Sequence, residues 1–146
     1  MPYVESSISV QAAPAAVYEV AKDMESYPEF MKDVESIITL ERTDHSTVTR
    51  WVTKLEGRTL KWTELDEFDD ENLIIRYTQT EGDLKKFEGY WKFESENGET
   101  KVTLTVDFEF GIPMVAALLH PIAKVKVREN CAMMLKGIKE KVEGTA

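Results

Sequence analysis

Prolines divide this chain more sharply than any other residue type. All five lie at positions 2, 14, 28, 113 and 121, so residues 29–112 contain none. Since proline cannot donate a hydrogen bond to a sheet ladder, this stretch favours strands. Turn signals interrupt it at Asp44-His45-Ser46, Glu56-Gly57-Arg58, Asp69-Asp70-Glu71-Asn72, Glu81-Gly82-Asp83 and Glu96-Asn97-Gly98-Glu99. The intervals are too short for parallel crossovers, so the stretch predicts six strands in an antiparallel meander.

Two of these strands alternate in polarity with a period of two. Residues 87–94 place an apolar or small residue at every second position, and residues 102–110 repeat the pattern. A further strand is expected over Tyr3–Gln11, where Val4, Ile8 and Val10 share one side. The prediction is a seven-stranded sheet with one apolar, buried face.

Helices are expected on both sides of the meander. Pro14 suits the first position of a helix, and Ser26-Tyr27-Pro28-Glu29-Phe30-Met31 begins a second short one. After a short segment from Pro113, a long helix is expected from about Pro121 to Glu143. At 1.5 Å per residue it would be about 35 Å long, enough to cross a curved sheet. The predicted class is α+β, a helix-grip fold with two short helices between strands 1 and 2 and a curved antiparallel sheet around a long C-terminal helix.

Composition excludes several classes of protein. The 146 residues, with 18 basic and 27 acidic side chains and a net charge of −9, are expected to form one domain over residues 1–146. The acidic balance argues against nucleic acid as a partner. One cysteine, Cys131, and two histidines cannot make an ordinary zinc site or an intrachain disulfide, and no cofactor is implied. Without a secretory signal or a run of roughly 18 apolar residues, the chain is expected in the cytoplasm.

A curved sheet around one helix encloses more volume than its side chains readily fill. We expect the space to be largest where Gly89 replaces a bulky inward residue. Apolar cavities with a few polar groups are usual sites for small molecules, so the pattern favours an apolar ligand. A fully packed core is the alternative.

The order of motifs along the chain resembles the START-like, birch-pollen-allergen-type (SRPBCC) superfamily. The resemblance rests on these segments: Ser26-Tyr27-Pro28-Glu29-Phe30, Gly57-Arg58 followed by Trp62, Glu81-Gly82-Asp83, Gly89-Tyr90-Trp91-Lys92-Phe93 and Asp107-Phe108-Glu109-Phe110. It spans nearly the whole chain and implies a helix-grip fold with a deep cavity for an apolar ligand.

Two branches of the superfamily imply different functions. The Tyr27-Pro28-Glu29-Phe30 segment is similar to coenzyme Q-binding and ribosome-associated toxin-like members, whereas Gly57–Trp62 is similar to polyketide cyclases and dehydrases. In the cyclases a cavity arginine matches Asp66 here, and a second one matches Thr78. Both positive charges are absent from this sequence. The quinone-binding branch often has a Trp-Cys pair where this chain has Lys32 and Asp33.

The resemblance and the alternation together give a set of candidate ligand-binding residues. They are Tyr27, Phe30, Trp62, Glu64, Phe87, Gly89, Trp91, Phe108, Asn130 and Met134. Flat aromatic faces suit quinone, prenyl or polycyclic ligands, although the same residues could simply pack a core. For Trp51 we favour core packing or the outer face.

Catalytic residues are less well defined by the sequence, and the candidates are Glu64, Asp66, Arg76 and Tyr77. Glu64 and Asp66 share a strand face and could act as an acid/base pair if buried, or form a solvated pair at the rim. The strand around Arg76 offers two faces. The face with Ile75 and Tyr77 is the more apolar, whereas the family register places Arg76 inside, and the sequence leaves both open.

The C-terminal helix is basic in an acidic chain. Residues 113–146 carry six basic and three acidic side chains, a net of +3 against −12 for the remainder. Such a helix could contact acidic lipid headgroups transiently or complement the acidic sheet. The oligomeric state is left open.

Three functions are therefore compatible with the sequence. The favoured hypothesis is binding or transport of an apolar small molecule, such as a lipid, a prenyl quinone or a polycyclic, polyketide-like compound, between the sheet and the C-terminal helix. A polyketide cyclase, aromatase or dehydratase is the alternative. A toxin-like regulator that binds a partner is the third.

Overall fold

The computed structural model describes residues 3–55, 58–109 and 113–144, and the expected architecture is confirmed. In the described residues, seven strands form one antiparallel sheet in the order β1-β7-β6-β5-β4-β3-β2. Their bounds are β1 (Tyr3–Val10), β2 (Val34–Arg42), β3 (Ser46–Leu55), β4 (Arg58–Asp69), β5 (Ile74–Gly82), β6 (Lys86–Glu96) and β7 (Glu99–Glu109). Strands β2 to β7 thus form the predicted meander, and β1 joins it beside β7. Of the turn signals, Glu56 and Gly57 lie outside the described residues.

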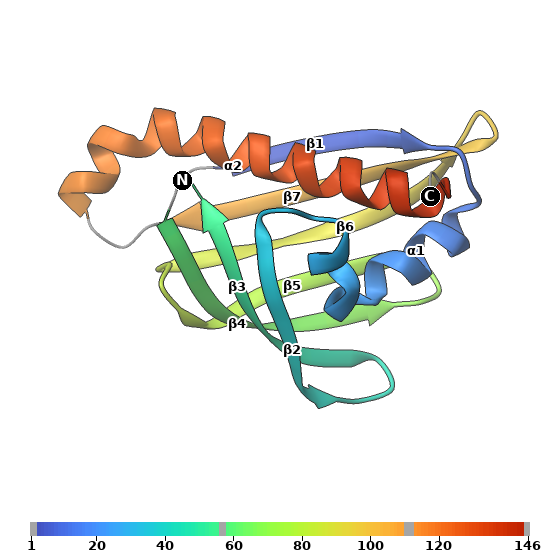
Figure 1. Ribbon diagram of the computed structural model, residues 1–146, viewed down its shortest axis with the longest axis horizontal. Helices are drawn as coiled ribbons and strands as arrows, with labels where there is room; N and C mark the ends of the chain where they lie inside the picture. The colour runs from blue at the N-terminus through green and yellow to red at the C-terminus, as the bar shows by residue number, and fades with distance from the viewer. Residues whose placement is uncertain (1–2, 56–57, 110–112, 145–146) are drawn as a thin grey trace.

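The two short helices lie between β1 and β2, as predicted. The α-helix α1 (Pro14–Lys22) has Pro14 within its first two positions, where the missing N–H costs no helical hydrogen bond. The 3-10 helix η1 (Met24–Glu29) follows directly and packs against β2. Together they cover one end of the sheet near the C-terminal half of the long helix (Figure 1).

The long helix α2 (Pro113–Val142) extends over 30 residues. The expected start at Pro121 is wrong, because the helix begins eight residues earlier and includes this proline. A proline inside a helix removes one hydrogen bond and bends the axis without necessarily ending the helix. In Figure 1 the first turns of α2 (orange) lie at an angle to the rest.

The concave face of the sheet and the inner side of α2 form the core. Figure 1 shows α2 running alongside β1 and β7 while the other strands curl away beneath it. The residues Cys131, Leu135 and Ile138, spaced at i, i+4 and i+7, are all buried on the helix. They face a sheet surface that includes the buried Trp91, Phe93 and Phe108, and the space between these two surfaces holds the site.

Candidate functional site

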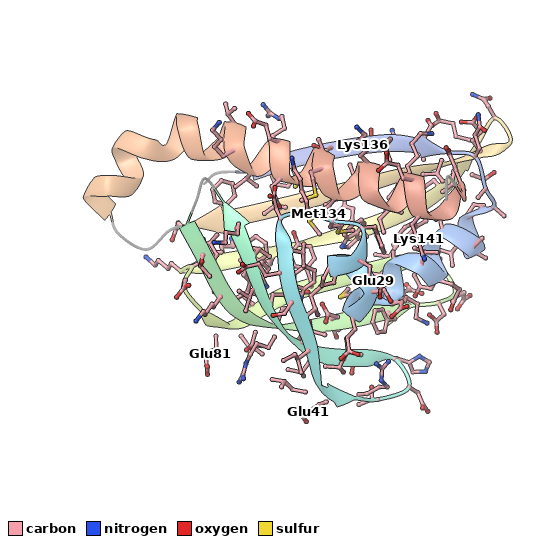
Figure 2. The ribbon with its side chains drawn as sticks, viewed as in Figure 1. Glu29, Glu41, Glu81, Met134, Lys136 and Lys141 are labelled. Carbon is pink, nitrogen blue, oxygen red and sulfur yellow. The ribbon has the colours of Figure 1, made fainter. Side chains whose placement is uncertain are left out.

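A cavity lies between the sheet and α2. Its volume is about 60 Å³. The lining side chains come from β3 to β7, α2 and the β5–β6 connection: Trp51, Thr53, Leu60, Trp62, Glu64, Tyr77, Leu84, Phe87, Trp91, Leu104, Val106, Phe108, Val127, Asn130, Cys131 and Met134. Figure 2 shows Met134 on the side of α2 that faces the sheet.

Aromatic rings form one continuous wall of this cavity. Trp51 and Trp62 are directly opposite each other on β3 and β4, and their rings stack with centroids 5.4 Å apart and planes 14° apart. Phe87 lies 4.8 Å from Trp62 and 5.4 Å from Tyr77, again between ring centroids. Cross-strand neighbours on one face of an antiparallel sheet bring these rings together. The two indoles are nearly parallel, whereas the Phe87 ring is tilted by 58° from Trp62 and by 50° from Tyr77.

The indole nitrogens of this wall are used inside the protein. Trp62 Nε1 donates to Glu64 Oε1 at 2.7 Å, and Trp51 Nε1 donates to Thr49 Oγ1 at 2.8 Å. An indole N–H is a donor only, so neither ring has a further hydrogen bond to give. Both tryptophans therefore present only carbon surfaces to the cavity.

Beside the aromatic wall, β4 carries a pair of buried carboxyl groups. Glu64 is 2% exposed and lines the cavity, and Asp66, two residues along β4 on the same face, is completely buried. Asp66 Oδ2 accepts hydrogen bonds from Thr47 Oγ1 at 2.9 Å and Thr49 Oγ1 at 2.6 Å. The alternative of a solvated rim pair is therefore wrong, since the curl of the sheet encloses this part of β4.

Burial decides how this pair holds its protons. Loss of water raises the pKa of Glu64 well above its ordinary value, and the neighbouring Asp66 raises it further. Burial also raises the pKa of Asp66, but hydrogen bonds from Glu64, Thr49 and Thr47 oppose this. The arrangement favours an ionised Asp66 beside a protonated Glu64. A neutral acid beside a carboxylate can in principle both give and take a proton.

Most of the predicted ligand-binding residues lie in the cavity wall. The structure brings together Trp62, Glu64, Phe87, Trp91, Phe108, Asn130 and Met134 from the predicted set. Tyr27 is buried behind this wall, with its ring against Trp51 and Trp91 and its hydroxyl donating to the Ala21 carbonyl. Phe30 is half-buried and packs against Tyr27, so these two residues support the wall without lining it.

Gly89 does not open space in the cavity, and that expectation is wrong. Tyr77 is directly opposite Gly89 on β5, and its hydroxyl donates to the Thr105 carbonyl at 2.6 Å. A Cβ at Gly89 would lie 2.0 Å from the Thr105 oxygen and 2.8 Å from the Tyr77 hydroxyl. The room that glycine leaves is filled by the Tyr77 phenol and the backbone of β7.

Arg76 lies outside the cavity. Its side chain is exposed, whereas Ile75 and Tyr77 are buried, so the more apolar face of β5 is the inner one. The family register, which placed Arg76 inside, is wrong here because Ile75 is opposite the inward Trp91. Of the four catalytic candidates, Glu64, Asp66 and Tyr77 are buried near one another. The Tyr77 hydroxyl already donates its hydrogen bond to the Thr105 carbonyl.

Several residues of the site were missed by the sequence analysis. Trp51 packs in the core, one of its two expected places, but it also lines the cavity, and Thr47 and Thr49 donate hydrogen bonds to Asp66. These three and Thr53 alternate along β3, so the period of two contained the signal. Threonine is common on both faces of strands, so the threonines of β3 did not show which face of the strand is buried.

Two further searches cover the described part of the chain. No group of three or more His, Cys, Asp or Glu side chains there is arranged to hold a metal ion. None of its helices is both long and apolar enough to cross a membrane.

A curved antiparallel sheet that grips a C-terminal helix and encloses a cavity is the helix-grip fold of START-like and birch-pollen-allergen-type proteins. The chain belongs to the family described as polyketide cyclase / dehydrase and lipid transport, whose model matches residues 10–134. No curated protein matches the chain significantly.

Solved structures extend this comparison. The chain is 36% identical to the TTHA0849 protein of Thermus thermophilus, with 99% of each chain covered and a TM-score of 0.94. It is 22% identical to the Zhui aromatase/cyclase of Streptomyces sp. R1128, covering 97% of this chain and 93% of that one, with a TM-score of 0.88. A START superfamily protein of Mycobacterium smegmatis is 17% identical over 99% of both chains, with a TM-score of 0.82. The last two likenesses establish the fold alone.

Proposed function

We propose that this protein binds or carries an apolar small molecule in the cavity between the sheet and α2. The observation that carries the proposal is the lining itself, in which stacked indoles and aliphatic side chains surround one buried carboxyl group. A lipid, a prenyl quinone and a polycyclic, polyketide-like compound all offer the apolar surface that such a lining desolvates favourably.

The size of the cavity sets a condition on binding. A cavity of about 60 Å³ is small for a polycyclic ligand. Four lining residues, Leu60, Phe87, Asn130 and Met134, are only half-buried, and a larger ligand would have to displace them. Methionine adapts its shape at low cost, which makes Met134 the simplest residue to move.

A thermal-shift experiment tests this function. A short-chain prenyl quinone, an anthraquinone and a phospholipid are each added to the purified protein, and at least one is expected to raise its melting temperature. Cys131→Phe, which fills the cavity from α2, is expected to abolish the shift. Ala132→Phe adds the same ring on the exposed side of that helix and serves as the control. Asn130→Phe replaces Cys131→Phe if the latter fails to fold, and an unchanged shift in a folded blocking variant would contradict the proposal.

A second function, cyclisation or dehydration of a polyketide-like substrate, is supported by one observation. A protonated Glu64 beside an ionised Asp66 could donate a proton to a leaving hydroxyl or take one from an acidic carbon. No lysine, arginine or histidine is among the described lining residues, so no cation there would stabilise an enolate. Turnover of a poly-β-ketone thioester that is lost in Glu64→Gln would support catalysis, whereas turnover indifferent to this change would exclude Glu64 from it.

Contact with a membrane surface stays a prediction. Lys124, Arg128 and Lys136 are exposed on α2, while Lys139 is held by Glu143 and by the Ser9 carbonyl. Sedimentation with vesicles containing anionic lipid, compared with neutral vesicles, would test it.

A further inference from the structure

The polar groups of the cavity wall can be separated into those already satisfied and those still available. The N–H groups of Trp51 and Trp62 donate to Thr49 and Glu64, and the hydroxyl of Tyr77 donates to the backbone of Thr105. What remains at this end of the cavity is mainly acceptor capacity on the carboxyl pair.

Glu64 keeps acceptor capacity at the cavity wall after the hydrogen bonds within the pair are made. Asp66 Oδ2 receives two threonine hydroxyls, and Asp66 Oδ1, which receives neither, is the oxygen left for the hydrogen bond from the protonated Glu64. Glu64 Oε1 receives only Trp62 Nε1, which leaves a lone pair free on an oxygen at the cavity wall. Asp66 does not line the cavity, so the acceptor that a ligand donor can reach is this Glu64 oxygen.

The charge of the pair restricts which donor can enter. The described lining has no basic side chain to neutralise an incoming anion, and a carboxylate would meet Glu64 and Asp66 at short range in a water-poor site. Burying a second like charge without a partner is costly. A neutral hydroxyl brings a donor without bringing that charge.

We propose that the Glu64–Asp66 pair is the polar subsite of the cavity, that it accepts a hydrogen bond from the hydroxyl group of an uncharged aromatic ligand, and that it rejects carboxylates. The inference rests on the proposed binding function and narrows its ligand class. A ligand whose oxygen atoms can only accept, such as a fully oxidised quinone, gains nothing from this subsite. A phenol or an enol gains one hydrogen bond.

Binding of four probes with one ring system tests the subsite. They are 2-naphthol, 2-fluoronaphthalene, 2-naphthoate and the cation of 2-(aminomethyl)naphthalene, each followed by quenching of tryptophan fluorescence at neutral pH. Fluorine approximates the size of a hydroxyl group but donates no hydrogen bond. We expect 2-naphthol to bind about tenfold more tightly than 2-fluoronaphthalene, and 2-naphthoate to bind more weakly than either.

Variants connect these preferences to the two carboxyl groups. Glu64→Leu removes the acceptor and is expected to reduce the preference for naphthol over fluoronaphthalene to about one. Glu64→Gln can still accept from Trp62 and the ligand while its amide donates to Asp66, so the preference should survive. Asp66→Asn removes the charge and should improve binding of 2-naphthoate severalfold. It also provides a readout if Glu64→Leu does not fold.

Two other polar lining residues are controls. Thr53→Val and Asn130→Leu each remove a polar group from the wall without touching the pair, and the naphthol preference should remain in both. Loss of the preference in Asn130→Leu alone would move the subsite to α2 and overturn the assignment.

The remaining outcomes separate the two proposals. Equal binding of naphthol and fluoronaphthalene overturns the subsite but leaves apolar binding in place. Tight binding of naphthoate also overturns it, and an ammonium probe tenfold tighter than naphthol replaces the uncharged ligand with a cationic one. If no probe binds while a lipid or quinone raises the melting temperature, the subsite fails alone. Failure of every compound removes both proposals.

Discussion

The phenol of Tyr77 lies directly over Gly89, and its hydroxyl reaches across that residue to the Thr105 carbonyl at 2.6 Å. One hydrogen bond thus joins β5 to β7 over the strand that separates them. It also removes the Tyr77 hydroxyl from any chemistry in the cavity. Gly89 is required here because the Tyr77 phenol and the Thr105 carbonyl occupy the position that a Cβ would take. Only a residue without a Cβ lets the three strands come this close.

Replacing Gly89 by alanine is expected to destabilise the protein by about 3 kcal/mol, the upper range for overpacking, because the new methyl group would meet the backbone oxygen of Thr105. Urea unfolding followed by circular dichroism measures the loss. Gly98→Ala is the comparison, since no atom lies within 4 Å of its Cβ position and only its φ of +82° opposes alanine. Its cost should be about 1 kcal/mol. Equal costs for the two variants would contradict the steric explanation.

Local patterns predicted the strands because their causes are local. Proline exclusion, turn residues and two-residue alternation each depend on a few neighbouring positions, and they placed β1 to β7 correctly. The orientation of Arg76 depends instead on pairing with β6, where Ile75 is opposite Trp91 and Arg76 is opposite Tyr90. A pair of isoleucines at 74 and 75 makes either face of β5 acceptable until that pairing is known.

The candidate site was predictable in outline for the same reason. Alternation placed Trp62, Glu64 and Asp66 on one face of β4, but burial of the carboxyl groups depends on how far the whole sheet curls. Gly89 faces the core as expected. The residue that fills the space beside it, Tyr77, lies on β5, so the pattern of β6 alone could not predict it. Both the burial of the carboxyl groups and the filling of the space beside Gly89 depend on contacts between strands, which the pattern within one strand does not contain.

The stability of the protein is expected to carry a signature of the buried pair. Between the ordinary pKa of a glutamate, 4.5, and the raised pKa of Glu64, the folded protein holds a proton that the unfolded chain has released. Raising the pH across this range therefore favours unfolding, and the contribution of Glu64 is most favourable below pH 4.5. Asp66, whose pKa is raised from 3.8, acts in the same direction.

Glu64→Gln isolates this effect, because glutamine does not titrate. The free energy of unfolding of the variant, measured in urea from pH 4.5 to 7, should improve relative to the unsubstituted protein as the pH rises. Glu67→Gln, an exposed position on the same strand, controls for general loss of negative charge. A difference that is flat with pH for Glu64→Gln, or equal for both variants, would mean that Glu64 is not desolvated.

Cys131 should report on opening of the cavity. Burial raises the pKa of its thiol to about 12, so about one molecule in ten thousand carries the thiolate at pH 8. Labelling by a disulfide reagent is expected to be slow in the native protein, fast in urea, and slower still when a ligand fills the cavity that Cys131 lines. Native labelling as fast as labelling in urea would show that α2 does not cover this residue.

The two threonines of β3 that share a face with the cavity should differ in their importance for stability. Thr49 accepts from Trp51 Nε1 and donates to Asp66 Oδ2, so Thr49→Val breaks both bonds while keeping the side-chain shape. A lost hydrogen bond to a buried charged group costs about 2 kcal/mol. Thr53 lines the same cavity four residues along, and Thr53→Val should cost less than about 1 kcal/mol.

Urea unfolding at pH 7 tests the contrast in stability between Thr49→Val and Thr53→Val. Repeating it at pH 4 adds a second check, because protonation of Asp66 weakens it as an acceptor and should narrow the gap between the two variants. A gap that is the same at pH 4 and at pH 7 would indicate that Asp66 is already neutral at pH 7 and that Glu64 does not face a carboxylate. A gap that is absent at pH 7 would contradict the importance of the two Thr49 hydrogen bonds.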